Sequence, residues 1–120
     1  MTIRQALAAL DGSQYNTMPQ EEKVRYLSEL DRFVFDLMGE FEKMPPVFSG
    51  YDADTDPDTE LLAPPPFDGM YLHWLRAQVD LHNREYTHFN NSSALYQTAW
   101  QAFSDHYLRT NTPKNKGKFH

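Results

Sequence analysis

Six prolines fall within or beside residues 45–66, and they restrict the fold more than any other feature of the chain. Proline cannot donate a backbone hydrogen bond, and it disfavours helix in the residue before it, so no helix can run through this segment. The segment has no helical period, and in DADTDPDTE an acid occupies every second position. We therefore predict an extended Pro/Asp-rich linker over residues 45–66, of a length that is uncommon inside a small domain.

Helical periodicity is clear before the linker. Thr2 opens a T-x-x-Q capping pattern, and apolar residues then recur at helical spacing up to Gly12, which predicts a short first helix. A second T-x-x-Q pattern begins at Thr17, and an apolar stripe at 3-4 spacing follows it. We predict a long second helix that is buried on one side and ends at the prolines at positions 45 and 46.

Two further helices are expected after the linker. Asp68 is a candidate N-cap for the third helix, and a fourth runs from Glu85 to about Arg109. The break between them is placed near Asn83, but the poor helix formers at residues 90–93 leave a break there as the alternative. The pattern thus predicts two helices on each side of the linker.

These elements predict an all-α fold, a small bundle of about four helices in which an extended linker joins two N-terminal helices to two C-terminal ones. The chain has 120 residues, 40% of them hydrophobic, which is enough for the core of one domain. We assign residues 1–112 to a single helical domain and residues 113–120 to a basic tail that is expected to be disordered. The expected core residues are Leu27, Leu30, Val34, Leu37, Leu72, Leu75, Val79 and Phe103.

Charge and cysteine usage exclude several classes of protein. The final stretch RTNTPKNKGKFH holds four basic residues and no acid, so it adds +4 and leaves −10 on residues 1–108 out of a formal net charge of −6. An acidic body of this kind repels phosphate backbones, which argues against nucleic-acid binding by a basic face. The absence of cysteine excludes disulfides, thiolate zinc sites and cysteine nucleophiles. No long apolar run or secretion signal is present, so we expect a soluble protein and no membrane partner.

The alternating acids of the linker suggest a calcium loop at first sight. An EF-hand loop that began at Asp52 would have Asp54 and Asp56 at its third and fifth positions. However, Pro57 stands where the loop needs glycine, and Ala63 stands where it needs a bidentate glutamate. We therefore expect a solvated acidic linker rather than a calcium site.

One further pattern bears on metal chemistry. Glu85 and His88 form a single E-x-x-H, which is half of the motif used in four-helix di-iron carboxylate sites. The second copy is absent, and no H-E-x-x-H pair or glycine-rich phosphate loop occurs. We therefore expect His88 to be a surface or hydrogen-bonded histidine, and we predict no metal, no cofactor, no catalytic residue and no enzyme activity.

The two C-terminal helices are rich in large aromatic residues. One interpretation is an aromatic core, and the other is that some of these side chains contact another subunit, because interfaces favour Tyr and Trp. Both interpretations stay open at this level. The residues are Tyr71, Trp74, Tyr86, Phe89, Tyr96, Trp100, Phe103 and Tyr107.

In the order of its segments, the chain resembles a family of tailed-bacteriophage proteins encoded among the head genes. The resemblance rests on EEKVRYLSELDRFVF, on YDADTDPDTELLAPPPFDGMYLHWLRAQVDLHNREYTHFNNS and on FSDHYLRTNTPK, and it covers the chain from about Gln20 to Lys114. Its acid-Thr-acid linker and its double asparagine are the specific motifs. The sequence departs from the family pattern at Arg84, where relatives often have Gly, and at His82, where a small or aromatic residue is usual.

The resemblance implies a virion structural protein similar to head-tail connectors (adaptors), which form a ring below the portal and join the capsid to the tail. It also implies a dodecameric homo-oligomer in the neck of the virion, made in the bacterial cytoplasm. The implied partners are the portal and other neck or tail-completion proteins, and DNA would pass through the ring without specific binding. The alternative is a non-virion assembly chaperone or a small protein-binding regulator.

If the chain is such a connector, the linker and the start of the third helix are expected near a subunit or portal contact. A linker that serves as an arm should order on a neighbour, and deletion of residues 47–62 should then spare the helical fold but block assembly. The residues expected at this contact are Asp52, Asp54, Asp56, Leu61, Leu62, Phe67 and Tyr71.

Overall fold

The computed structural model describes residues 1–40 and 47–110, and within these ranges the fold is all-α, as predicted. The described residues form no strand, and a single isolated β-bridge pairs Thr2 with Glu60. The second helix was expected to run to the prolines at positions 45 and 46, but it ends earlier, at Gly39, with Glu40 as its C-cap. The prolines themselves and the tail at residues 113–120, which was expected to be disordered, lie outside the described residues. The elements are α1 (Ile3–Ser13), α2 (Gln20–Gly39), the short 3-10 helix η1 (Phe67–Gly69), α3 (Met70–His82) and α4 (Tyr86–Thr110).

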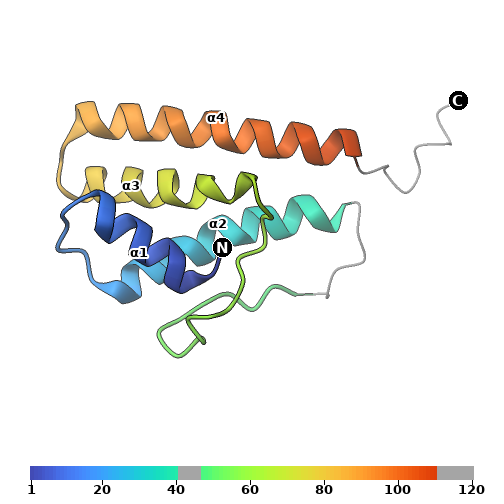
Figure 1. Ribbon diagram of the computed structural model, residues 1–120, viewed down its shortest axis with the longest axis horizontal. Helices are drawn as coiled ribbons and strands as arrows, with labels where there is room; N and C mark the ends of the chain where they lie inside the picture. The colour runs from blue at the N-terminus through green and yellow to red at the C-terminus, as the bar shows by residue number, and fades with distance from the viewer. Residues whose placement is uncertain (41–46, 111–120) are drawn as a thin grey trace, which may run out of the picture.

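Helix α3 lies at the centre of the bundle. It packs against α4 on one side and against α1 and α2 on the other, so that α4, α3 and the N-terminal pair form successive layers (Figure 1). The linker passes below α1 and α2 and then rises to the start of α3 (Figure 1). Within the described ranges, every helix is too short or too polar to cross a membrane.

The core is built from the apolar faces that helical spacing predicts, with additions from the linker. Tyr71 is fully buried, and Leu61 and Ala63 of the linker also belong to the core. Leu37 and Leu72 are half-buried and pack against the core. The other six expected core residues are at most 1% exposed: Leu27, Leu30, Val34, Leu75, Val79 and Phe103.

Helix α1 begins as the sequence predicts. The Thr2 hydroxyl accepts a hydrogen bond from the Gln5 backbone N–H at 3.1 Å, and the Gln5 side chain accepts one from the Thr2 N–H at 2.9 Å. The linker also stabilises the start of this helix. The carbonyls of Thr59 and Pro57 accept hydrogen bonds from the N–H groups of Ile3 (3.1 Å) and Arg4 (2.8 Å). Donors that helix geometry leaves unpaired are thus satisfied by residues more than fifty positions away.

The predicted cap of α2 is wrong. Thr17 does not cap the helix; the N-cap is Pro19, which makes no side-chain cap hydrogen bond, and α2 starts at Gln20. A proline at this position offers no side-chain acceptor, and the first turn carries Glu21 and Glu22, which favour the positive end of the helix dipole.

Replacing Thr2 with alanine should lower the free energy of unfolding by about 1 kcal/mol, because the first turn of α1 loses its capping acceptor. Chemical denaturation followed by circular dichroism measures the change. The matched control is Thr17→Ala, which removes a threonine that does not cap α2 and should change stability by less than about 0.5 kcal/mol. Equal losses in the two variants would contradict the cap assignment.

The predicted cap of α3 is wrong, whereas the predicted break between α3 and α4 is confirmed. Asp68 does not cap α3; it lies inside η1, and α3 begins at Met70 after Gly69, with no side-chain cap. The break between α3 and α4 falls at Asn83, and residues 90–93 lie inside α4. The turn needs only a few residues because Arg84 adopts φ 58°, the left-handed conformation that usually favours glycine.

Candidate functional site

The linker is held against the helices by a buried carboxylate. Asp31 of α2 is fully buried and accepts hydrogen bonds from the hydroxyls of Tyr51 and Tyr71, each at 2.5 Å. Its Oδ2 also accepts the backbone N–H of Leu62 at 3.0 Å, and the Tyr71 hydroxyl accepts the N–H of Ala63 at 2.8 Å. One side chain therefore joins α2, both ends of the described linker and α3.

Burial dominates the electrostatics of this cluster. Loss of water raises the pKa of Asp31 above its usual value, against the hydrogen bonds from Tyr51, Tyr71 and the Leu62 N–H, which favour the charged form. Burial, and then the charge of Asp31, raise the pKa of both tyrosine hydroxyls, so both remain protonated donors at neutral pH. These groups act as a structural anchor for the linker.

The residues expected at a contact surface fall into three groups by their exposure. Leu61 and Tyr71 are 5% and 0% exposed, so they belong to the interior of this chain, and their assignment to a contact surface is corrected. Leu62 and Phe67 are half-buried, and the Phe67 ring lies 5.8 Å from the ring of Phe103. Those that remain exposed are Asp52, Asp54 and Asp56.

The exposed acids have a local role that the sequence pattern did not reveal. Asp52 Oδ1 accepts the N–H of Asp54 at 2.8 Å, and Asp56 Oδ1 accepts the N–H of Asp58 at 2.9 Å. Aspartate commonly closes turns in this way, by binding the backbone two residues further on. The alternation of acids therefore builds two consecutive turns, and the Asp–x–Asp spacing was the signal for them.

The aromatic residues of α3 and α4 mostly serve the core. Tyr71, Phe103 and Tyr107 are buried, Trp74 contacts Tyr96 at 4.9 Å between ring centres, and most of the others are partly buried. Of the eight aromatic residues in question, Tyr86 alone is exposed, at 59%. The aromatic content by itself therefore gives little support to a subunit contact.

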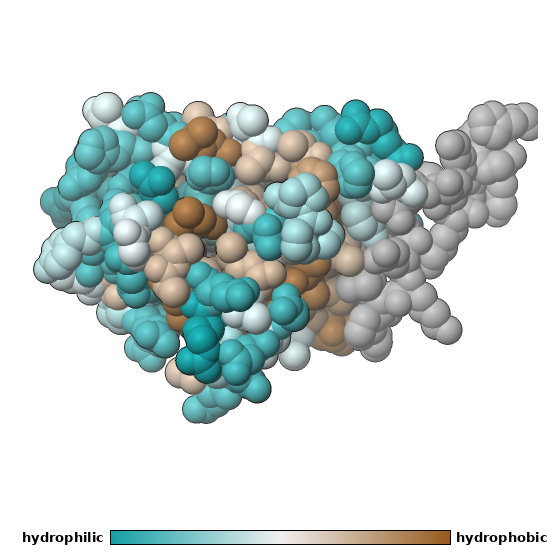
Figure 2. All heavy atoms as spheres, viewed as in Figure 1, coloured by the Kyte–Doolittle hydropathy of each residue, from teal (hydrophilic) through white to brown (hydrophobic). Residues whose placement is uncertain are grey.

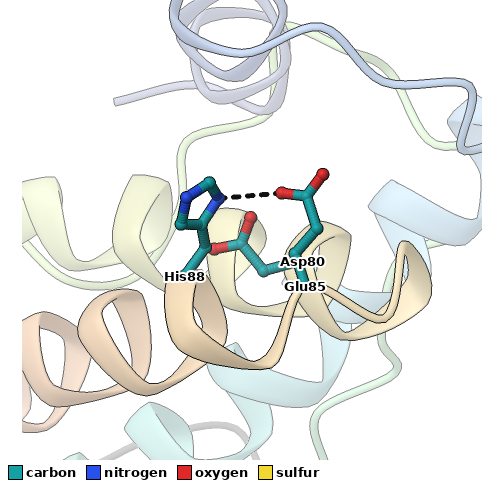
Figure 3. A group of neighbouring side chains, drawn as sticks. All are labelled: Asp80, Glu85 and His88. Atoms are coloured by element: carbon teal, nitrogen blue, oxygen red, sulfur yellow. Dashed lines mark hydrogen bonds and ion pairs between the residues drawn. The ribbon is translucent and has the colours of Figure 1, made fainter.

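A second cluster lies at the turn between α3 and α4, where Asp80, Glu85 and His88 come together (Figure 3). One potential ligand atom from each residue can be chosen so that all lie within 4.8 Å of one another. His88 Nδ1 lies 2.8 Å from Glu85 Oε2 (Figure 3). Asp80 is 3% exposed, whereas the side chains of Glu85 and His88 are 49% and 68% exposed.

Backbone and side-chain contacts place these three residues. The N–H of Glu85 donates to the Asp80 carbonyl at 2.9 Å, which closes the turn. Asp80 Oδ1 accepts from Nε2 of Gln14, the C-cap residue of α1, and Asp80 Oδ2 accepts from the Ser92 hydroxyl of α4, each at 2.7 Å. Asp80 therefore lies where three helices meet.

A pocket of about 690 Å³ adjoins the cluster. Most of the residues that line it carry polar side chains, with amide, carboxylate, imidazole and guanidinium groups beside the apolar Leu95 and the ring of Tyr15. The sequence indicated Glu85 and His88 as a pair, but it gave no signal for Asp80, Gln14 or Ser92, because their proximity arises only from the packing of α1, α3 and α4.

No family model, no curated protein and no solved structure matches this chain.

Proposed function

We propose that the chain is a structural protein of a tailed-bacteriophage virion, a head-tail connector that forms a ring below the portal and joins the capsid to the tail. The sequence resemblance carries this proposal, through the acid-Thr-acid linker that leads into LLAPPPFD and through the double asparagine after Phe89. A small helical domain with a firmly packed linker is compatible with such a building block. The predicted virion location follows from the same resemblance.

The outer side of α4 supports a contact between subunits. No Asp, Glu, Lys or Arg occurs from Tyr86 to Ser104, although residues 1–108 carry a formal charge of −10. Interface centres are depleted of charged residues in this way. On this side of α4 the exposed residues from Ala94 to Ala102 are small or neutral, among them Thr98.

The arrangement of the helices leaves this side of α4 free for a neighbour. In the described residues α4 packs on α3 and η1, and its opposite side lies at the edge of the bundle (Figure 1). On the face shown in Figure 2, small apolar areas are separated by hydrophilic ones. We therefore assign the lateral contact in the ring to α4 of a second copy, rather than to an extended arm.

Native mass spectrometry of the purified protein, alone and mixed with the portal protein of the same phage, tests the proposal. We expect a closed oligomer or a stoichiometric complex with portal. Ala102→Glu should weaken assembly at least tenfold by placing a charge in the contact. The matched control is Ala8→Glu, on the exposed side of α1, which should assemble normally. A strict monomer that never joins portal would contradict the proposal.

Proteomics of purified virions separates the connector from the alternative. A connector should be present in every finished particle. A chaperone or regulator should be found in the infected-cell lysate and be missing from the particles, and that result would replace the proposed function.

A further inference from the structure

We propose that Asp80, Glu85 and His88 form a binding site for one divalent transition-metal ion, with Zn²⁺ as the probe, that joins the end of α3 to the start of α4. The proposal concerns residues outside the predicted linker contact and does not depend on the proposed function. It departs from the expectation, drawn from the single E-x-x-H pattern, that His88 is only a surface or hydrogen-bonded histidine.

The first argument is the unpaired charge of Asp80. A carboxylate that is only 3% exposed needs hydrogen-bond donors, a cation or a metal to offset its loss of water, and Asp80 has only two side-chain donors, whereas Asp31 has three donors. Among the described residues, no Lys, Arg or His side chain makes an ion pair with Asp80. Arg76 lines the same pocket but does not pair with Asp80. The side-chain hydrogen bonds to Asp80 come from the neutral donors Gln14 and Ser92.

The second argument is the geometry of the three ligands. Two ligands on one Zn²⁺ ion lie about 3–3.5 Å apart, because each bond is about 2.0–2.2 Å long. Glu85 Oε2 and His88 Nδ1 are 2.8 Å apart, at hydrogen-bond distance, so a bound ion would replace this contact and separate the two atoms slightly; the set as a whole lies within 4.8 Å. Both of these side chains are about half exposed or more, so they have room for the small rotations that would bring them around one ion.

The third argument is the support around the ligands. Metal-binding carboxylates are usually held in place by hydrogen bonds from neighbouring side chains. Gln14 Nε2 and the Ser92 hydroxyl each donate to a different oxygen of Asp80, which leaves each oxygen a free lone pair. One imidazole and two carboxylates suit Zn²⁺ or Mn²⁺ better than Cu(I), which prefers sulfur.

Isothermal titration calorimetry of the tag-free, chelator-treated protein with Zn²⁺ tests this site. We expect about one Zn²⁺ per chain with a Kd at or below roughly 10 µM. Binding should weaken at least tenfold in Glu85→Gln and in His88→Ala, whose side chains are exposed and whose loss should not unfold the protein. The matched control His82→Ala removes an exposed histidine outside the cluster and should bind as the parent protein does.

Thermal unfolding supplies an independent readout. A hundredfold excess of free Zn²⁺ over Kd should raise Tm by roughly 10 °C in the parent protein and in His82→Ala, and by much less in His88→Ala. No saturable binding in the parent protein would overturn the site. Binding that survives both Glu85→Gln and His88→Ala would overturn it as well, because the metal would then be held elsewhere.

Discussion

Replacing Asp31 with alanine is expected to lower the free energy of unfolding by about 3–5 kcal/mol, a large part of the stability of a domain this size. The change removes the acceptor for the hydroxyls of Tyr51 and Tyr71 and for the N–H of Leu62. Each donor then stays buried without its partner, or must admit water into the core. Urea denaturation followed by circular dichroism measures the loss.

The control for this prediction lies on the same helix. Asp36 is exposed near the end of α2, so Asp36→Ala should change stability by less than about 0.5 kcal/mol. If Asp31→Ala were no more destabilising than Asp36→Ala, the anchor described for the linker would not hold in solution.

The pH dependence of stability gives a second test of Asp31. Its folded pKa is raised, so the folded state holds the proton more tightly than the unfolded state does. The stabilising contribution is therefore complete below the unfolded pKa of about 3.9 and is lost as the pH rises through the folded pKa. Asp31→Asn should lack this loss, which unfolding curves from pH 4 upward detect as a difference in slope between the two proteins.

Deletion of residues 47–62, with a short Gly/Ser bridge in their place, is expected to unfold the protein. This reverses the expectation for an arm that orders only on a neighbour. The deletion removes the core residue Leu61, the Tyr51 hydroxyl that binds Asp31, and the carbonyls that pair with the first N–H groups of α1. Circular dichroism and the dispersion of amide signals in NMR spectra report the loss of the fold.

A surface variant separates the packing of the linker from its charge. Asp52, Asp54 and Asp56 are exposed, and asparagine can close the same turns, so the triple Asp→Asn variant should stay within about 1 kcal/mol of the parent protein. A deletion protein that kept its full helical signal and cooperative unfolding would show instead that the linker is dispensable for the fold.

Local patterns predicted most of the helical structure. The capping box at Thr2 and the apolar spacing of α2 and α3 depend on residues within one or two turns of each other, which a single sequence displays directly. The cap predicted at Thr17 failed because the pattern occurs without the helix starting there. The helix break near Asn83 was correctly preferred, although residues 90–93 are poor helix formers, because tertiary packing outweighs local propensity.

These local patterns did not predict the long-range polar contacts. Asp31 falls within an apolar helix face, and nothing in its neighbourhood indicates that Tyr51 and Tyr71 will meet it. In the same way, the E-x-x-H pattern identified Glu85 and His88, while Asp80 joined them only through the turn that follows α3. Hydrogen bonds between distant segments leave no periodic pattern in the sequence. The sequence therefore suggested a solvated linker, whereas in the structure the linker is hydrogen-bonded to the helices.

The pairing of the linker carbonyls with the start of α1 also has a consequence for the order of folding. Ile3 and Arg4 meet their partners at Thr59 and Pro57, so the first turn of the protein closes a loop of more than fifty residues. Closing such a loop costs chain entropy before the contact can stabilise anything, and contacts between distant residues slow folding. During synthesis the N–H groups of Ile3 and Arg4 therefore gain these partners only after the linker has emerged from the ribosome.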